Sequence, residues 1–387
     1  MMKFSRRFGM VAVLCTSALA LAVGMPAKAA EKKTIGLALT GFHIEMPDRA
    51  DECPDGFQFN SVDNFKAMYP DEKARDNVGK LLPDSGSQSM GAPEHRGPNA
   101  ESISFRPWII KDPLPFREVQ SKIAFGKNLD GTTDGRATDK TCKHQKFTSV
   151  DGTATDIDNE LFRVTACWRG MRKGGHPREF FDSQNLVANP NNRFLIEISD
   201  VDDELNDDHV DVTFYKGMDK IVRDAKGEPY PGLSQRVDRR DPDYTQHTTG
   251  KIINGELITD TMPKFVRPFI HAQFAVGEFE TLDMQLRLKL DSTQAQGLMT
   301  GYYDISKWYF LHAKTARIGV GNWSPSSMWE ALVRRADGYK DPKTGQCSAI
   351  SSAYGIQAVR THIIKDEQPA RTAETNSKEF KAAQNSR

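Results

Sequence analysis

Apolar side chains occupy every second position of the run TLDMQLRLKLD (281–291), from Leu282 to Leu290. A period of two is typical of a strand with one buried face and one solvated face. The run GLMTGYYDISKWYFLHA (297–313) follows it closely. We therefore expect residues 297–313 to form its antiparallel partner.

Two further patterns predict hairpins. RFLIEISD (193–200) and HVDVTFYKG (209–217) are β-branched and aromatic runs joined by an aspartate-rich loop. In GKIINGELITD (250–260), Asn254 and Gly255 separate two apolar runs, which is the strongest short-range hairpin signal. These strands are close in the chain, so antiparallel pairing is expected.

One helix is predicted near the end of the chain, at residues 324–338. Ser327 and Glu330 have the spacing of a capping box, and Gly338 can end the helix. A single face would carry four apolar residues: Trp329, Leu332, Val333 and Ala336. A shorter helix is expected from Asp71, as its N-cap, to Leu82.

Many short antiparallel strands separated by polar turns indicate a mainly β fold. We predict an antiparallel β-sandwich of the jelly-roll or concanavalin-like kind, with long loops and a C-terminal helix. A β-propeller fragment is the alternative, and the absence of a fixed repeat disfavours it.

The first 29 residues have the pattern of a secretory signal peptide. Three basic residues in MMKFSRRFGM precede the apolar run Val11–Gly24, and Ala27-Lys28-Ala29 suits cleavage after Ala29. No later run has the roughly 18 to 20 apolar residues that span a bilayer. We therefore expect an exported protein without a membrane span.

The remaining chain divides by composition. Residues 30–125 are rich in Pro, Gly, Asp and Ser and are expected to form an irregular extension packed on the core. Residues 126–364 hold the predicted sandwich and its acidic loops. Residues 365–387 have no aliphatic run and are expected to be a disordered tail.

The charge balance gives no reason to expect nucleic acid as a partner. The chain has 52 Lys and Arg against 52 Asp and Glu. Removal of residues 1–29 takes away four basic residues, so 48 basic face 52 acidic residues. Such a balance does not attract phosphate backbones or anionic lipids.

Four cysteines remain after removal of the signal peptide: Cys53, Cys142, Cys167 and Cys347. An even count in an exported chain predicts two disulfides, and the absence of Cys-x-x-Cys argues against a redox or zinc site. Three pairings are open. We favour Cys142–Cys167, which closes the acidic segment, together with Cys53–Cys347.

The segment 128–160 is unusually acidic for a folded region. Asn128, Asp130 and Asp134 provide oxygen ligands at alternating positions, as calcium prefers. An EF-hand is excluded because Thr132 and Thr141 stand at its third and twelfth positions. The loop is loosely similar to thrombospondin type 3 calcium repeats, which implies structural calcium.

Further acidic residues extend this hypothesis to three clusters. Bound calcium would reverse the repulsion between the carboxylates. The candidate metal ligands are Asn128, Asp130, Asp134, Asp151, Asp156, Asp158, Asp202 and Asp207. The alternative is solvated loops in which aspartates form Asx turns and N-caps. His144 is the histidine of interest because it lies beside these loops.

No catalytic motif is found, and whether the chain is an enzyme stays open. Gly-x-Ser-x-Gly, His-Glu-x-x-His and the phosphate-binding glycine loop are absent. If the chain is an enzyme, the β-hairpin loop supplies the residues to test first: Asp200, Asp202, Asp207 and His209. Tryptophans and tyrosines such as Trp308 and Tyr309 can stack on sugars, but core packing is the favoured role.

Three stretches carry a resemblance: FRPWIIKDPLPFREVQSKIAFGKNLDGTTDG, DGTATDIDNELFRVTACWRG and ADGYKDPKTGQCSAISSAY. They look like a group of secreted proteobacterial proteins to which no activity is assigned. The resemblance implies export from a Gram-negative cell, to the periplasm or beyond. The resemblance implies no chemistry. Because the loops are rich in oxygen ligands and no nucleophile or acid–base pair is recognisable, we hypothesise a calcium-stabilised binding protein of the cell envelope, whose partner is a glycan or another envelope protein. The alternative is an exported enzyme acting on a polysaccharide or small envelope substrate.

Overall fold

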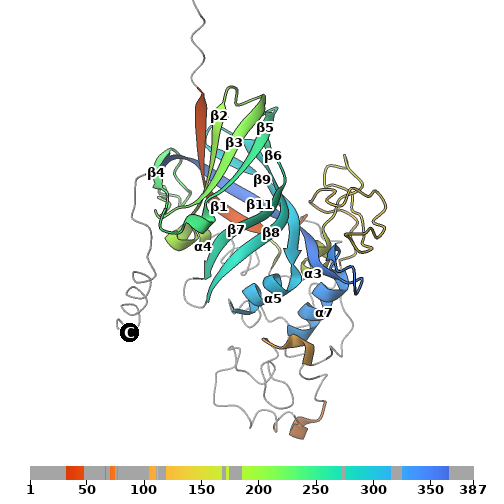
Figure 1. Ribbon diagram of the computed structural model, residues 1–387. Helices are drawn as coiled ribbons and strands as arrows, with labels where there is room; N and C mark the ends of the chain where they lie inside the picture. The colour runs from red at the N-terminus through yellow and green to blue at the C-terminus, as the bar shows by residue number, and fades with distance from the viewer. Residues whose placement is uncertain are drawn as a thin grey trace, which may run out of the picture. The chain divides into compact units, whose positions relative to one another are not determined.

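The structure is a computed structural model of the 387-residue chain (Figure 1). It describes residues 32–47, 66, 70–74, 76, 104–109, 111, 119–167, 171–173, 185–271, 275–314 and 325–365. The predicted signal peptide, Cys53 and nearly all of the predicted tail lie outside the described residues. None of the described helices combines the length and apolar character needed to cross a membrane.

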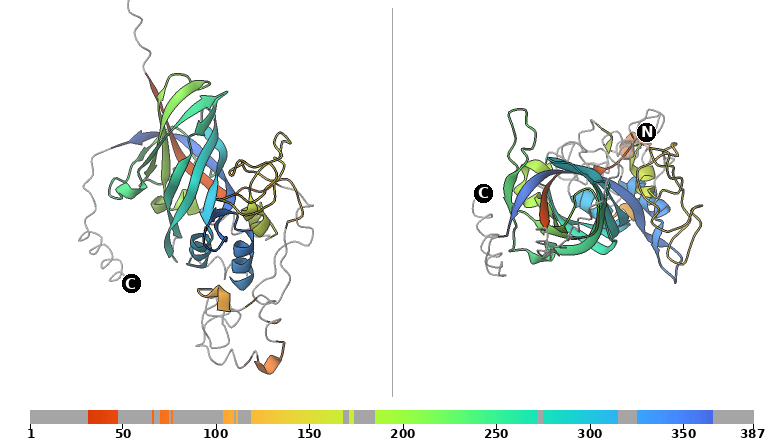
Figure 2. Two further views of the ribbon diagram at one scale, coloured as in Figure 1. Left: turned by 45° about the vertical axis from the view of Figure 1, so that its right-hand side comes forward. Right: turned by 90° about the horizontal axis from the view of Figure 1, so that it is seen from above.

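Eight antiparallel strands follow one another around a closed ring (Figure 2). In ring order they are β1 (Lys33–Ile44), β2 (Phe194–Val201), β3 (Asp207–Lys216), β5 (Gln246–Ile253), β6 (Glu256–Thr259), β8 (Ala275–Leu290), β9 (Gln294–Asp304) and β11 (Cys347–Ile364). The pairing of β1 with β11 closes the ring. The mainly antiparallel β class is thus confirmed, but the expected jelly-roll or concanavalin-like sandwich is replaced by a barrel.

The predicted hairpins are three pairs of neighbouring strands in this barrel. Residues 194–201 pair with 207–216, and β5 pairs with β6 across Asn254 and Gly255. Both turn residues have positive φ, 52° and 72°, which is the conformation that Asn-Gly adopts most easily in a two-residue turn. β8 pairs with β9 as expected.

Bulges help the sheet to curve into a ring. The register of β1 shifts between Leu39 and Gly41, which leaves Thr40 as an extra residue against β11. A second shift lies between Leu282 and Gln285 of β8, where Asp283 has a φ of 49°. An extra residue bends its strand and increases the local twist. The alternation of apolar and polar residues along the sequence does not predict these bends.

The barrel interior is filled mainly by apolar side chains, together with the buried Arg267. Leu39, Phe194, Phe214, Met284 and Ile356 from five strands face one another there. The free space between them is only about 10 Å³, so the interior serves as the hydrophobic core. Trp308, Tyr302, Tyr303 and Tyr309 are also buried, which confirms core packing for these aromatics.

Three further strands pair with members of the ring outside the path of the eight strands. β4 (Leu233–Arg236) pairs in parallel with the end of β11, β7 (Met262–His271) pairs with β8, and β10 (Gly338–Lys340) pairs with the start of β11. The described helical elements are η2 (Pro107–Ile109), α3 (Glu160–Thr165), α4 (Asn185–Ala188), η5 (Pro190–Asn192), η6 (Pro242–Tyr244), α5 (Ile305–Lys314) and α7 (Pro325–Arg335).

Buried Arg193 holds α4 against the barrel. Its guanidinium donates to the carbonyls of Leu39, Leu186, Val187 and Asp219 at 3.0 to 3.2 Å. Burial lowers the pKa of Arg193 to about 10, so the group stays charged at neutral pH. Four carbonyl oxygens thus replace the water that an exposed arginine would bind.

Several local expectations need correction. The predicted partner strand 297–313 ends at Asp304, and the helix α5 takes up its second half. The predicted C-terminal helix is present as α7, but it begins at Pro325, so Ser327 is not its cap. Val333 is exposed, unlike Leu332 on the buried face.

The N-terminal segment also differs from expectation. Residues 33–44, assigned to an irregular extension, form β1 of the barrel. Residues 72–74 are helical, and the N–H of Lys73 donates to the Asp71 carboxylate at 3.1 Å. The rest of the helix predicted to Leu82 lies outside the described residues, apart from Asp76.

Candidate functional site

Asn128, Asp130, Asp156 and Asp158, four of the eight predicted metal ligands, lie together in residues 119–167. The amide of Asn128 donates to Asp156 at 2.7 Å and to the carbonyl of Thr132 at 2.8 Å. The carboxylate of Asp158 accepts the backbone N–H of Leu129 at 2.7 Å. The acidic segment is thus a folded loop whose aspartates satisfy its backbone donors.

Lys146 lies between the two buried carboxylates of this loop. Its ammonium is 2.7 Å from Asp130 and 2.6 Å from Asp158. His144 lies beside it, with Nε2 3.0 Å from Asp158 and 3.6 Å from Asp130, and Nδ1 2.8 Å from the carbonyl of Cys142. We name Asp130, His144, Lys146 and Asp158 the buried ion cluster.

Hydrogen bonds favour the charged forms of Asp130 and His144. Burial acts to raise the pKa of Asp130, but the bonds from Lys146 and Thr132 outweigh it and lower that pKa. Burial acts to lower the pKa of His144, but Asp158 and the carbonyl of Cys142 raise it to about 9. An imidazolium donates from both ring nitrogens, which matches its two acceptors.

Three side chains of this cluster provide the kinds of atoms that bind metal ions. The ligand atoms of Asp130, His144 and Asp158 lie within 4.8 Å of one another, as a metal site requires. Calcium, however, prefers six to eight oxygen ligands, and these carboxylates already accept from Lys146 and from backbone or hydroxyl donors. An ion between Asp130 and Asp158 must displace the ammonium of Lys146.

The other four predicted ligands do not join this group. Asp134 is exposed, and Asp151 accepts from Ser149 and Thr153 in a turn. Asp202 lies in the loop between β2 and β3, and Asp207, the first residue of β3, accepts the N–H of Asp202 at 2.6 Å. These are the Asx-turn roles that the alternative interpretation expected.

The acidic segment is tied to the barrel by a disulfide. Cys142 is bonded to Cys347 at the start of β11, with 6.1 Å between their Cα atoms. The favoured pairs Cys142–Cys167 and Cys53–Cys347 are therefore both wrong. Cys167 is also disulfide-bonded, and its partner lies outside the described residues. The prediction failed because β11, which is distant in the sequence, lies beside the acidic segment in space.

A large cavity lies on the outer wall of the barrel, under residues 124–127 and 149–157. It has a volume of about 790 Å³. Two rows of paired residues cross β1, β11, β9, β8 and β6 beneath it, and most of their members line its floor. The first row is Gly41, Gln357, Gln296, Lys289 and Glu256; the second is His43, Gly355, Leu298, Arg287 and Ile258.

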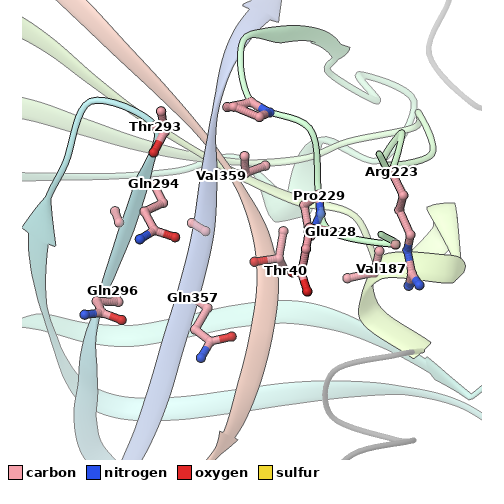
Figure 3. A pocket seen from close by; sticks show the side chains of 14 residues that line it. Thr40, Val187, Arg223, Glu228, Pro229, Thr293, Gln294, Gln296, Gln357 and Val359 are labelled. Atoms are coloured by element: carbon pink, nitrogen blue, oxygen red, sulfur yellow. The ribbon is translucent and has the colours of Figure 1, made fainter. Parts of the chain in front are cut away.

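A second cavity of about 510 Å³ adjoins it on the same wall (Figure 3). Gln294 and Gln296 from β9, Gln357 from β11 and the bulged Thr40 from β1 line it, with Glu228 of the loop before β4 beside them. Gln296 and Gln357 line both cavities. The two cavities therefore meet at this pair, and we name them together the wall groove.

The glutamines of the wall groove are open to a ligand. Gln294, Gln296 and Gln357 are exposed, and their amides make no hydrogen bond with any residue that the structure describes. Gln357 and Gln296 stand directly opposite each other. The side chain of Gln357 lies over Gly41, where an added Cβ would be 2.8 Å from its Oε1. Small Gly41 thus lets this amide lie flat on the floor.

A histidine–glutamate pair lies in the floor of the larger cavity. His43 Nε2 is 2.7 Å from Glu45 Oε2, and both side chains are mostly buried. They lie across Gly355, where an added Cβ would be 1.8 Å from Glu45 Oε2. A carboxylate that holds one ring nitrogen orients the imidazole for proton transfer at the other.

Comparison with known proteins adds no relative. No family model, no curated protein and no solved structure matches the chain. The proposed function therefore rests on the geometry of the wall groove and of the buried ion cluster.

The sequence predictions missed the wall groove. Part of the signal was present, since Arg287 and Lys289 were on the expected wet face of the strand 281–291. Nothing in the sequence pattern brings His43 or Lys127 to that face, because their placement needs the closure of the ring and the fold of residues 119–167.

Proposed function

We propose that the protein binds a polar, chain-like ligand of the glycan type along the wall groove. The observation that carries this proposal is the meeting of two cavities at Gln296 and Gln357, whose amides have no partner among the described residues. Side-chain amides donate and accept hydrogen bonds side by side, which matches the neighbouring hydroxyls of a sugar ring. Each cavity is in the size range of a small-ligand site.

The shape of the groove favours a chain over a compact molecule. A single compact ligand would fill one cavity, whereas two adjoining cavities suit successive units of an oligomer. Between the described residues of the barrel interior, the space is only about 10 Å³. We therefore place the ligand on the wall and not inside the ring, as part of the proposal.

The compartment and the calcium ion belong to the proposal as well. Export to the periplasm or cell surface rests on residues 1–29 and would bring the wall groove into contact with envelope glycans. Calcium is proposed for residues 128–160, where it would stabilise the loop that roofs the larger cavity. Lys146 competes with such an ion for Asp130 and Asp158.

The binding proposal is tested with defined hexasaccharides of glucose, N-acetylglucosamine and galacturonic acid, by calorimetry on the purified protein. At least one should bind, and Gln296→Ala together with Gln357→Ala should weaken it by about tenfold or more, because two paired hydrogen bonds are lost. Gln346→Ala is the matched control, since Gln346 is exposed and outside the groove. If the double variant and the Gln346→Ala control bind the sugar with equal affinity, or if no sugar binds, the proposal is contradicted.

A second candidate function is catalysis on the bound chain, favoured by His43 and Glu45. In this role His43 is a general base that Glu45 orients. Incubation of a bound hexasaccharide with the protein should then release new reducing ends, and His43→Gln should abolish the release without loss of binding. An uncleaved sugar leaves the groove as a binding site alone.

A further inference from the structure

Lys127 is a half-buried cation in the roof of the larger cavity. No carboxylate among the described residues pairs with it, and its ammonium makes no hydrogen bond there. Lys146 and Lys216, by contrast, each contact two aspartates. A partly desolvated ammonium without a counter-charge is costly, so Lys127 needs an explanation that the fold does not supply.

The backbone holds Lys127 over the groove. Gly126, which precedes it, has a φ of 154°, and a Cβ there would lie 2.6 Å from Ile157 and 2.7 Å from the carbonyl of Asp158. The N–H of Asp158 donates to the carbonyl of Lys127 at 3.0 Å. Residues 126 and 127 are thus packed tightly onto residues 157 and 158. This packing fixes the position of Lys127 in the roof of the cavity.

A second cation faces the same cavity from the floor. Arg287 on β8 lines it, and its charge acts on Lys127: burial first, and then Arg287, lower the pKa of the Lys127 ammonium. Arg287 itself pairs with Glu256 at 2.6 Å, so Glu256 balances only one of the two charges. Lys289, also on the floor, donates to the carbonyl of Asn254.

The other acidic groups of the cavity are already engaged. Glu45 contacts His43, and Asp151 accepts from Ser149 and Thr153. No described carboxylate therefore contacts the ammonium of Lys127, which faces the cavity opposite Arg287. An oxyanion between two cations in a partly dry cavity gains charge-assisted hydrogen bonds.

We propose that the wall groove is specific for an acidic chain, with a carboxylate or sulfate group of the ligand bound between Lys127 and Arg287. This inference rests on the proposed function and specifies its ligand. The glutamines then bind hydroxyls along the chain, and the two cations select the charged unit. Carboxylate and sulfate share the chemistry that these cations recognise.

The test compares three probes of matched length: an oligogalacturonate, a sulfated dextran oligomer and neutral dextran. Their affinities are measured by calorimetry on the purified protein at low and high salt. One or both acidic probes should bind at least about tenfold tighter than dextran and lose affinity with salt, because ions screen the contact. Tighter galacturonate identifies a carboxylate ligand, and tighter sulfated dextran a sulfate ligand.

Variants assign the effect to the two cations. Lys127→Met and Arg287→Met should each remove the preference for the acidic probe, whereas Lys127→Arg should retain it. Lys251→Met is the control, since Lys251 is an exposed lysine on β5 outside the groove. Unchanged thermal unfolding in Lys127→Met and Lys127→Arg separates loss of binding from loss of fold.

The results distinguish failure of the anion subsite from failure of the proposed glycan binding. If Gln296→Ala weakens sugar binding but Lys127→Met leaves the acidic preference intact, the groove binds glycans and the anion subsite is wrong. If the acidic probe binds equally to Lys127→Met, Arg287→Met and the Gln296 variant, it binds elsewhere and both proposals fail. Tighter binding of neutral dextran than of both acidic probes also overturns the subsite.

Discussion

Lys146 and Arg193 are two buried cations that the fold stabilises in different ways. Arg193 donates to backbone carbonyls, whereas Lys146 contacts the carboxylates of Asp130 and Asp158. Only the second arrangement leaves negative charges behind when the cation is removed. The stability of a variant at residue 146 therefore depends on whether another cation can neutralise the two carboxylates.

Lys146→Met should destabilise the protein by about 3 to 5 kcal/mol, since removal of one partner leaves buried charges unpaired. Calcium should then raise the melting temperature of the variant more than that of the unchanged protein, because the ion takes the place of the ammonium. Thermal unfolding in EDTA and in calcium measures both effects. A larger calcium response in the unchanged protein would mean that the ion binds beside Lys146 and not in its place.

Asp337 gives a pH dependence with a definite sign. It is fully buried; burial first, and then the charge of Glu160, raise its pKa from 3.8 to about 7. The folded state thus holds a proton that the unfolded chain releases, so this contribution to stability is lost as pH rises from 3.8 to about 7. Asp337→Asn should remove that slope and make the protein more stable above pH 7.

Urea unfolding between about pH 4 and about pH 8 tests this prediction. The variant should gain about 1 to 3 kcal/mol over the unchanged protein at the alkaline end, because it no longer ionises a buried carboxyl. Asp139→Asn is a suitable control, since Asp139 is exposed. Parallel pH profiles for Asp337→Asn and the unchanged protein would contradict the assignment.

At the scale of elements, local patterns predicted pairs that are close in the chain. Asn254 and Gly255 marked the β5–β6 turn, and alternation from Leu282 to Leu290 marked β8. The second half of 297–313 was misassigned because buried Trp308 and Tyr309 suit a strand as well as a packed helix. Apolar runs without a clear period do not distinguish the two.

The disulfide was beyond local patterns. Cys142 and Cys347 are 205 residues apart, and only the path of β11 brings them together. Replacement of both by serine should cost about 2 to 5 kcal/mol. Hydrogen exchange should rise most in residues 124–157, the roof of the wall groove, and little in the β2–β3 hairpin. A uniform rise along the chain would show that the bond stabilises the barrel as a whole.

At the scale of the whole molecule, the sequence predicted the class of the fold and not its closure. Eight strands with one apolar face build either two packed sheets or one ring, and the alternation is the same in both. The same limit applies to the site. Asp130 and Asp158 were predicted from local acidity, whereas Gln296, Gln357 and Lys127 meet only because the ring and the acidic loop bring distant segments to one wall.

The pairing of β1 with β11 makes the order of folding matter. Gly36 pairs with Thr361, so the ring closes only after nearly all of the described chain is available. Contacts between such distant segments form slowly. Until then β1 and β9 each have an unpaired edge that can join a strand of another molecule. The last strand of the barrel is thus also the one that protects the protein from aggregation.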